Sequence, residues 1–409
     1  MSLRTSVLKN EDFRRLCLAQ FTSLTATYAI YFASMALVEE ITRSSAQMGL
    51  MIFSSTLPGL LFGLVAGVVV DRWERINVLV ASNALRVLVA LGFAAAIHIL
   101  PQTHLLLAIY LSNFCLSAII QFVASAEGAT IPRLVEENRL LAANSLFNLS
   151  SLASQGAGLV VLAPLLLKVG GGEAVSLAGA VLCLVALIAV ASLPREGSLR
   201  PREGRTLGRL WADLREGWRF IFSDRLVTLA TFQLTLTSVL ALVLSTLAPG
   251  FVARILGLEV ADAVYMAVPI GVGFGLGIAL VGRRGELMRK EGWISLGLLA
   301  LGLSLAVLSF PRRASGLFLP LILGVTLALG LGFALVIVPA KTILQERPPA
   351  QMRGRVISAQ LVLGNAASTL PIPLAGGLAD LIGIRKVVFL VALITLAVGA
   401  ISTSTAAKG

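Results

Sequence analysis

The stretch Gly67-Val-Val-Val-Asp71-Arg72-Trp-Glu-Arg75 joins two long apolar segments and concentrates charge in a short turn between them. The preceding residues place a glycine at every fourth position: Gly59, Gly63 and Gly67. Residues four apart share one face of a helix, and small residues on that face let a second helix approach closely. The pattern predicts that Asp71 lies at a helix end against a neighbouring helix, with Arg72 and Arg75 at the rim.

The composition of the whole chain agrees with a membrane setting for this turn. Of its 409 residues, 57% are hydrophobic and only 13% are charged, and the mean hydropathy is +0.91. Soluble domains carry roughly 25% charged residues. A soluble protein of this composition would have too little polar surface, so the sequence predicts an integral membrane protein.

Apolar segments long enough to cross a bilayer recur along the whole chain, since a spanning helix needs roughly 20 apolar residues. The sequence predicts an all-α membrane protein with twelve transmembrane helices in two related six-helix bundles. The expected spans are Phe13–Val38, Ala46–Val70, Ile76–Ile97, Leu105–Ala126, Leu141–Leu167, Ala174–Leu193, Leu226–Phe251, Ala261–Val281, Trp293–Phe310, Gly316–Ala340, Val356–Leu381 and Val387–Thr405.

The net charge of +12 is distributed unevenly between alternate loops. Most of the 33 Lys and Arg residues fall in one set of loops, which includes both termini and the long middle segment. This asymmetry is the positive-inside pattern of membrane proteins. It predicts a multi-pass protein of the cell inner (cytoplasmic) membrane with both termini in the cytoplasm, and it argues against a nucleic-acid partner.

A basic segment divides the chain near its midpoint. We expect an N-terminal six-helix bundle in residues 1–193, a cytoplasmic linker in 194–225 and a C-terminal six-helix bundle in 226–409. Within the linker, apolar residues from Leu207 to Phe222 recur at spacings of three and four with arginines between them. This predicts an amphipathic basic helix at the membrane surface. A sparse repeat also relates the halves, because Pro132, Arg139 and Asn144 recur at the spacing of Pro348, Arg355 and Gln360.

The charged turn resembles the loop between the second and third helices of the major facilitator superfamily of transporters. Further similar stretches are Asn10–Leu16, Pro132–Leu146 and Gln345–Val356. They resemble the branch that contains macrolide and siderophore exporters and the lysophospholipid transporter. The chain departs from the pattern by carrying Ile76 where a second basic residue is usual, and the fifth span lacks the Gly-Pro pair of proton antiporters.

The resemblance implies a conformational latch that holds the two halves of the transporter together in one state. The matching residues are Gly67, Asp71, Arg72 and Arg75, with partners at Glu127 and Arg355. Arg86 lies inside the third predicted span, where a charge costs roughly 2.5–3.5 kcal/mol on insertion scales. We assign Arg86 to the same latch.

Polar residues within the spans are candidates for a substrate cavity, because a polar side chain facing lipid would have no partner. The first predicted span is unusually polar. The alternative for each residue is a hydrogen bond to an adjacent helix. The candidates are Gln20, Ser23, Thr27, Tyr31, Asn113, Gln121, Asn148, Gln155, Gln233, Thr237 and Asn365.

Glu39, at the end of the first span, is the candidate for proton coupling; the alternative is an exposed acid at the rim. Cofactors and metals are not expected. The chain has no phosphate-binding G-x-x-x-x-G-K-[ST] motif, its two histidines are isolated, and its three cysteines lie scattered in apolar segments. We therefore do not expect an enzyme.

The leading hypothesis is a secondary active transporter that moves a small amphiphilic or hydrophobic compound by alternating access. The resemblance favours proton-coupled drug or metabolite efflux by a multidrug antiporter. Its expected partners are the substrate, protons and membrane lipids, and the expected state is a monomer. The alternatives are a lysophospholipid or other lipid transporter of the same fold, and a membrane protein that transports nothing.

Overall fold

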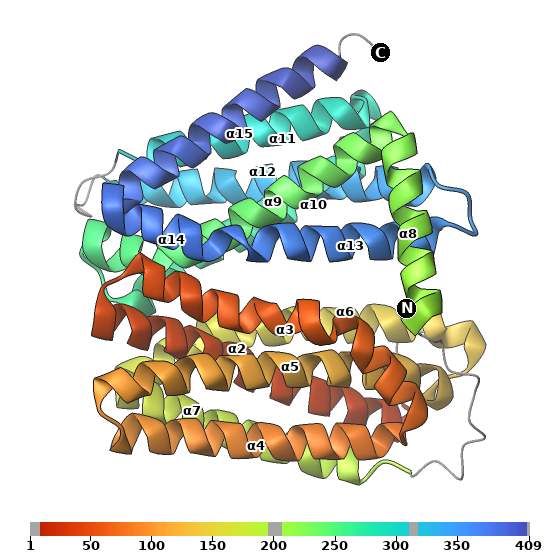
Figure 1. Cartoon of the computed structure of the whole chain (residues 1–409), viewed down its shortest axis with the longest axis vertical. Helices are drawn as coiled ribbons and strands as arrows, with labels where there is room; N and C mark the ends of the chain where they lie inside the picture. Colours follow the sequence, from red (N-terminus) through yellow and green to blue (C-terminus); the bar gives the residue numbers. More distant parts are fainter. Residues whose placement is uncertain (1–8, 195–206, 311–317, 407–409) are drawn as a thin grey trace. The chain divides into compact units, whose positions relative to one another are not determined.

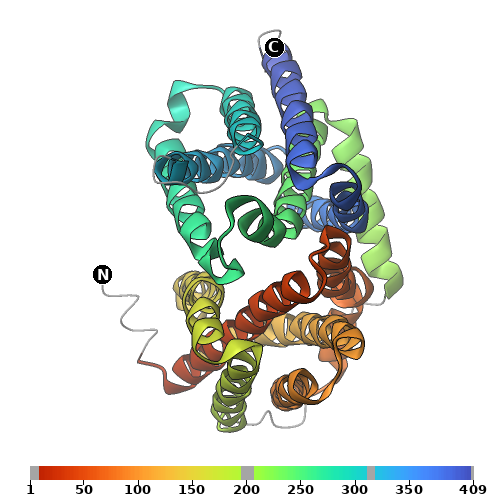
Figure 2. The same ribbon diagram turned by 90° about the vertical axis from the view of Figure 1, so that its left-hand side faces the viewer.

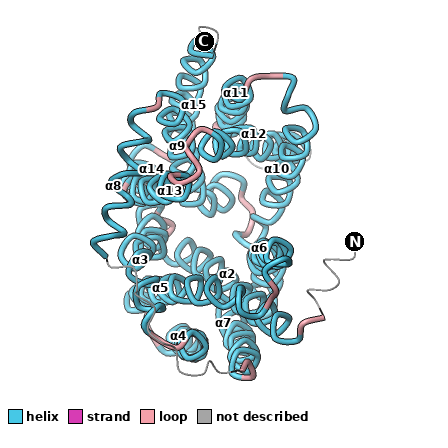
Figure 3. The backbone as a smooth tube through the Cα atoms, turned by 90° about the vertical axis from the view of Figure 1, so that its right-hand side faces the viewer, coloured by secondary structure: helices cyan, strands magenta, loops and turns pink. Residues whose placement is uncertain are grey.

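The computed structural model describes residues 9–194, 207–310 and 318–406, and all regular structure in these ranges is helical (Figures 1 and 3). The main helices are α2 Glu11–Thr42, α3 Ser45–Arg72, α4 Arg75–Ile99, α5 Gln102–Leu134, α6 Leu140–Gly156, α7 Ala163–Ala191, α8 Leu207–Ser223, α9 Arg225–Gly250, α10 Val264–Arg284, α11 Lys290–Leu308, α12 Phe318–Glu346, α13 Arg353–Thr369, α14 Pro371–Ile382 and α15 Ile384–Ala406. Short η segments extend or join them: η1 Glu137–Arg139, η2 Ala157–Leu162, η3 Phe251–Leu256, η4 Val260–Ala263 and η5 Gly285–Leu287.

The described residues contain 11 helical segments that are long and apolar enough to cross a membrane. One of them, Leu140–Ala191, has 52 residues, which is about 78 Å of helix against a hydrocarbon core of about 30 Å. It is broken at Gly170 (φ −148°) and Gly171 (φ 64°, ψ −162°), where the backbone leaves the helical region. The segment therefore crosses twice, and the prediction of twelve crossings is confirmed.

The structure divides into two compact units. Unit 1 contains the described residues of Met1–Ile41 and Ser54–Leu210, and unit 2 contains those of Thr42–Phe53 and Trp211–Gly409. Helix α3 is thus shared, since its first turns belong to unit 2 and the remainder belongs to unit 1. The sequence-based division at residues 193 and 226 assigned all of α3 to the N-terminal bundle.

Unit 1 is held together by a buried apolar cluster. Each of its long helices contributes to this cluster, and α3 does so through Val70 near its end. Its members include Phe13 of α2, Leu79 of α4, Ala126 of α5, Phe147 of α6 and Val190 of α7. Burial of such side chains is worth about 25 cal/mol per Å² in water; within lipid, close packing supplies the association instead. The packed unit provides a rigid frame for the polar residues of α2 and α5.

In unit 2, helices α10 and α12 lie side by side (Figure 2), and glycines let their backbones approach closely. A methyl group on Gly277 would lie 3.0 Å from the Leu331 carbonyl oxygen, and one on Gly273 would collide with the Leu327 carbonyl. Methyl groups on Gly271 and Gly275 would meet no described atom within 4 Å. Every second glycine of this run is therefore a packing residue.

Helix α9 begins at a capped end directly after α8. The Asp224 carboxylate accepts hydrogen bonds from the backbone N–H groups of Leu226 at 2.9 Å and Val227 at 3.1 Å. An acid at this position satisfies two of the unpaired amides of a helix start and interacts favourably with the helix dipole. The cap fixes the point at which the linker helix ends and the seventh crossing begins.

The conformation of Gly171 generates the first prediction. Its φ/ψ pair lies in a region that only glycine adopts without strain, so Gly171→Ala should destabilise the protein by about 1–3 kcal/mol. Gly92→Ala is the matched control, because Gly92 lies inside α4 and a methyl group there meets no described atom within 4 Å. Thermal unfolding in detergent should show a lower midpoint for Gly171→Ala alone; equal midpoints would contradict the assigned break.

Candidate functional site

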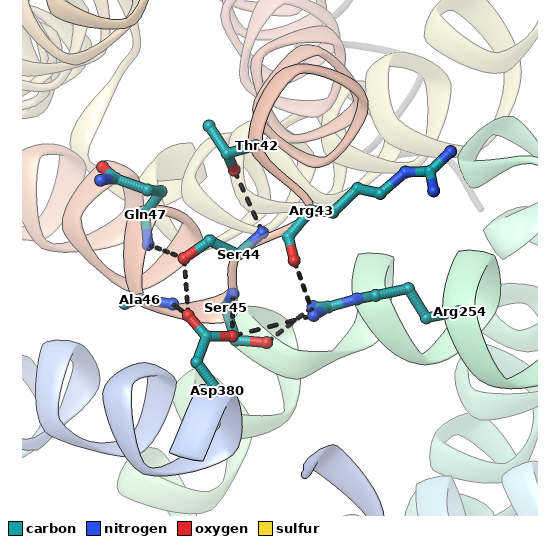
Figure 4. Close-up of polar contacts among 8 residues, drawn as sticks. All are labelled: Thr42, Arg43, Ser44, Ser45, Ala46, Gln47, Arg254 and Asp380. Carbon is teal, nitrogen blue, oxygen red and sulfur yellow. Dashed lines mark hydrogen bonds and ion pairs between the residues drawn. The ribbon is translucent and has the colours of Figure 1, made fainter.

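Asp380, in the last turn of α14, binds the first turn of α3 (Figure 4). One carboxylate oxygen accepts a hydrogen bond from the Ser45 backbone N–H at 2.7 Å. The other accepts from the Ser44 hydroxyl at 2.6 Å and from the Ala46 N–H at 2.9 Å. Hydrogen bonds to a charged group are roughly twice as strong as neutral ones, so Asp380 caps α3 from a distant part of the chain.

Arg254, in η3 at the end of the seventh crossing, completes this cluster. Its guanidinium donates to the Arg43 carbonyl at 2.8 Å and to the Ser45 hydroxyl at 2.7 Å, and it lies 3.7 Å from the Asp380 carboxylate. Arg43 has φ 47°, a left-handed conformation that is unfavourable for a residue with a side chain. The bond from Arg254 stabilises this turn. We call Ser44, Ser45, Ala46, Arg254 and Asp380 the Asp380 anchor.

Glycines let the backbones of α3 and α14 come together beside the anchor. A methyl group on Gly376 would collide with the carbonyl of Ser45, and one on Gly49 would lie 3.0 Å from the carbonyl oxygen of Ile372. Contacts this short leave no room for another side chain. The first turns of α3 therefore lie directly on α14, which is why they belong to unit 2.

The local sequence of the turn already favours a helix start. In Ser44-Ser45-Ala46-Gln47 the Ser44 hydroxyl accepts a hydrogen bond from the Gln47 N–H at 3.2 Å. A serine followed by glutamine three residues later is a recognised capping signature. The sequence thus indicated the cap of α3, but it gave no sign that Asp380 and Arg254 would join it.

Unit 1 contains two buried charges of opposite sign. Arg86 of α4 is fully buried and Glu127 of α5 is 7% exposed, and each acts electrostatically on the other. Within the described residues, none of the three guanidinium nitrogens of Arg86 has a hydrogen-bond partner. Such a group is costly to bury, and intramembrane charges of this kind mark functional sites.

The remaining residues of the predicted latch lie around the end of α3. A methyl group on Gly67 would meet no described atom within 4 Å, so this glycine has no close packing role in the observed state. Arg72 is exposed, whereas Arg75 is 8% exposed. The side chain of Asp71 lies outside what the structure describes.

Arg355, the expected partner in α13, is bound by the linker helix. Its guanidinium lies 2.9 Å from the carboxylate of Asp213 and 2.5 Å from that of Glu216, both in α8. On the same side of α8, the Trp218 indole N–H donates to the Ala359 carbonyl at 3.0 Å. Helix α8 is therefore attached to the start of α13 by two ion pairs and a hydrogen bond.

The polar residues of unit 1 are mostly engaged within the unit. Asn113 of α5 donates to the Ser34 hydroxyl of α2 at 2.8 Å, and the Thr27 hydroxyl donates to the Ser23 carbonyl at 2.8 Å. Tyr31 hydrogen-bonds Ser55 of α3. Other cavity candidates differ in exposure: Gln20 is buried, Gln121 and Gln155 are half-buried, and Asn148 is exposed.

In unit 2, Gln233 takes part in a buried hydrogen-bond network. Its amide donates to the Ser402 hydroxyl of α15 at 3.1 Å, and the Ser295 hydroxyl of α11 donates to Ser402 at 2.9 Å. Thr237 is 1% exposed and donates to the Gln233 carbonyl. The geometry of Gln233 and Thr237 therefore fits the alternative given for each cavity candidate, a hydrogen bond within the helix bundle. Asn365 of α13 is exposed.

Glu39, near the end of α2, is only 2% exposed. The alternative of an exposed acid at the rim is therefore wrong for Glu39, and its role in proton coupling stays a prediction. A carboxyl group enclosed in a membrane-spanning helix is a typical feature of proton pathways. Glu39 and Glu127 are thus the buried acids among the described side chains of unit 1.

The sequence is similar to a known protein family over most of its length. Residues 16–371 match the Major Facilitator Superfamily profile. The chain belongs to this superfamily. It is 26% identical over 382 residues to the multidrug efflux pump Tap of Mycolicibacterium fortuitum, covering 90% of this chain and 88% of that protein. It is 30% identical over 395 residues to the enterobactin exporter EntS of Shigella boydii, covering 92% and 87%.

Solved structures of superfamily members share the fold. The nucleoside transporter NupG superposes with a TM-score of 0.75 at 10% identity and covers 99% of both chains. A bacterial homologue of the human lysosomal transporter Spinster, in an inward-facing and unoccupied conformation, gives 0.70 at 13% identity, covering 100% of this chain and 98% of that one. The facilitator fold is thus confirmed, and the chain is a transporter of this superfamily, as its efflux relatives indicate.

The buried charge pair generates the second prediction. Removing one partner of a buried pair costs about 3–5 kcal/mol, whereas replacing both by apolar residues is often neutral. We expect Glu127→Leu to lower the unfolding free energy by about 3 kcal/mol, because it leaves the Arg86 guanidinium buried without a counter-charge. The double variant Arg86→Met/Glu127→Leu should recover most of this loss. Thermal unfolding of the purified variants measures both, and simple additivity would contradict the pairing.

Proposed function

We propose that this superfamily member exports a small amphiphilic or hydrophobic compound across the cytoplasmic membrane by alternating access, in exchange for protons. The proposal includes two halves that rock against each other, and both termini in the cytoplasm. The efflux functions named for its relatives support the direction. The scarcity of charged side chains in the spans supports an uncharged or amphiphilic cargo.

The observation that most supports alternating access is the Asp380 anchor. It fixes the first turns of α3, which belong to unit 2, to α14 and η3 of the same unit, whereas the rest of α3 continues into unit 1. The charge pattern predicts that this end of the helices faces away from the cytoplasm. While the anchor is formed, the outer ends of α3 and α14 stay together. Release of a compound to the outside then requires the anchor to break.

Arg355 provides the corresponding step at the opposite, basic end. In the observed state it binds Asp213 and Glu216 of α8. The family resemblance implies a second state in which Arg355 contacts the Gly67–Arg75 turn. We propose that Arg355 exchanges these partners as the Asp380 anchor breaks. In each state, polar contacts then close only one end of the transporter, either the end with the Asp380 anchor or the basic end with Arg355.

Proton coupling is assigned to the buried acids of unit 1. Glu127 lies in the field of Arg86, and Glu39 is enclosed at the far end of α2. A conformational change that alters the water access or charge environment of either acid changes its proton affinity. Proton binding and the opening of one side are then linked.

The third prediction concerns the anchor itself. Asp380→Ala removes three charge-assisted hydrogen bonds, each worth about 1.5–3 kcal/mol, so the outward-open state should gain population. In lipid nanodiscs, hydrogen–deuterium exchange at Ser45–Phe53 should accelerate at least tenfold. At the same time, exchange at Arg353–Ala359 should slow, because alternating access closes that end when the other opens.

The control for this experiment is Glu259→Gln, which removes an exposed acid from the same end of unit 2. It should leave exchange in both segments unchanged. Faster exchange at Ser45–Phe53 without any change at Arg353–Ala359 would mean that Asp380 merely caps a helix, and alternating access through this anchor would be wrong.

The fourth prediction concerns coupling and cargo. A thermal-shift screen of drugs, siderophores and lysolipids should identify a compound that stabilises the purified protein, with ethidium as the first probe. In proteoliposomes, an imposed pH gradient should drive uptake of that compound. Glu127→Gln should abolish this pH dependence while retaining movement down a concentration gradient.

Glu39→Gln is tested in the same assay to decide which acid binds the proton. Glu137→Gln, an exposed acid next to α6, is the control and should transport normally. Wild-type transport that ignores the pH gradient would reject proton exchange. Stabilisation by lysolipids alone would favour the lipid transporter of the same fold.

A further inference from the structure

Unit 2 contains a cavity of about 880 Å³ at the basic end of its helices. Its walls come from the ends of α10 and α12, the start of α11 and the first residues of α9. These helices lie side by side in Figure 3. The volume is in the range of small-molecule sites, about 300–1,000 Å³. The cavity lies within one unit, and no residue of the Asp380 anchor or of the predicted latch lines it.

Three cations line this cavity: Arg289, Lys290 and Arg347. The acids there are already engaged, since Glu346 pairs with Lys290 and the Glu291 carboxylate lies 3.9 Å from Arg289. Arg347 is exposed and forms no ion pair with any described side chain. The lining therefore carries one net positive charge, and the Arg347 guanidinium is available to an anion.

The rest of the wall is apolar. Ile278 and Val281 of α10 face Val338 and Pro339 of α12 across the cavity, and Met288 lies in the loop before α11. Ile278 is 45% exposed and Met288 is 41% exposed, so the apolar wall continues to the outside of the unit. A purely ionic ligand would leave this surface without a partner, whereas a ligand with a hydrocarbon chain would cover it.

The position of the cavity selects the source of such a ligand. It lies where three membrane-spanning helices end in a basic turn, which the positive-inside pattern predicts to be the cytoplasmic headgroup level. Basic pockets between helices on that side bind anionic lipid headgroups. An anionic headgroup would fit the arginines, and its acyl chain would fit the wall formed by α10 and α12.

We propose that this cavity binds an anionic phospholipid of the cytoplasmic leaflet, with the phosphate between Arg289 and Arg347. Bound there, the lipid bridges the ends of α10, α11 and α12. The site is separate from the transported compound. Its existence does not depend on the direction or coupling of transport.

The fifth prediction tests this site with dioleoylphosphatidylglycerol, titrated onto the detergent-purified protein and followed by native mass spectrometry. Each basic residue near an anionic surface contributes about 1 kcal/mol, which is about fivefold in affinity. Arg289→Gln/Arg347→Gln should therefore weaken the first binding step about 25-fold. Arg283→Gln/Arg284→Gln is the matched control: it removes the same charge from the end of α10 without touching the cavity lining, and should change affinity less than threefold.

Two further ligands separate the possible sources. Dioleoylphosphatidylcholine should bind the wild type at least tenfold more weakly than the anionic lipid, and glycerol 3-phosphate should neither bind nor compete at millimolar concentration. Equal weakening in both double variants, equal binding of the two lipids, or tight binding of glycerol phosphate would each overturn the proposal. The thermal midpoint of each lipid-free variant is compared with that of the wild type. A difference below about 2 °C corresponds to a small change in stability and shows that the fold is intact.

Discussion

The attachment of the first turn of α3 to Asp380 is the interaction on which the account of this transporter depends. A helix start leaves backbone N–H groups without partners inside the helix, and side chains, water or other groups must satisfy them. Here a carboxylate from α14 satisfies them, with Arg254 beside it. The first turns of α3, which these bonds hold, belong to unit 2, and the rest of the helix belongs to unit 1. In the proposed mechanism, one group of contacts therefore sets both the stability of a helix end and the state of the transporter.

Charges elsewhere in the protein are arranged so that few are left inside the bundles. Arg86 and Glu127 are enclosed together in unit 1, and Arg355 is bound at the surface by α8. Removing either of the first two charges is expected to be costly, because the other then stays buried without a counter-charge. The second pair is half-exposed and contributes little to stability, so it can exchange partners readily. In the proposed mechanism, Arg86 and Glu127 stay together within unit 1 in every state, whereas Arg355 exchanges its partners between states.

The twelve crossings and the transporter family were predictable because they depend on local properties: hydropathy, glycine spacing and the Asp71 turn. The break was also predictable, since the expected spans end at Leu167 and begin again at Ala174, on either side of the run Gly170-Gly171-Gly172. The capping signature of Ser44 was also present in the sequence. The roles of Asp380 and Arg254 were not predictable, since residues more than 120 positions apart meet only through packing. Gln233 shows the same limit, because its spacing fitted a cavity as well as it fitted the observed bond to Ser402.

The central claim is that the Asp380 anchor opens and closes during transport. Spin labels at Leu50→Cys and Leu381→Cys, in a chain whose three native cysteines are replaced by serine, would report it directly. Both positions are exposed, at 42% and 84%, and lie in unit 2, Leu50 in α3 and Leu381 in α14. Pulsed electron spin resonance in nanodiscs should give one short distance at rest and an added longer distance when pH is lowered or a transported compound is supplied. A single distance that is unchanged under all of these conditions would contradict the account.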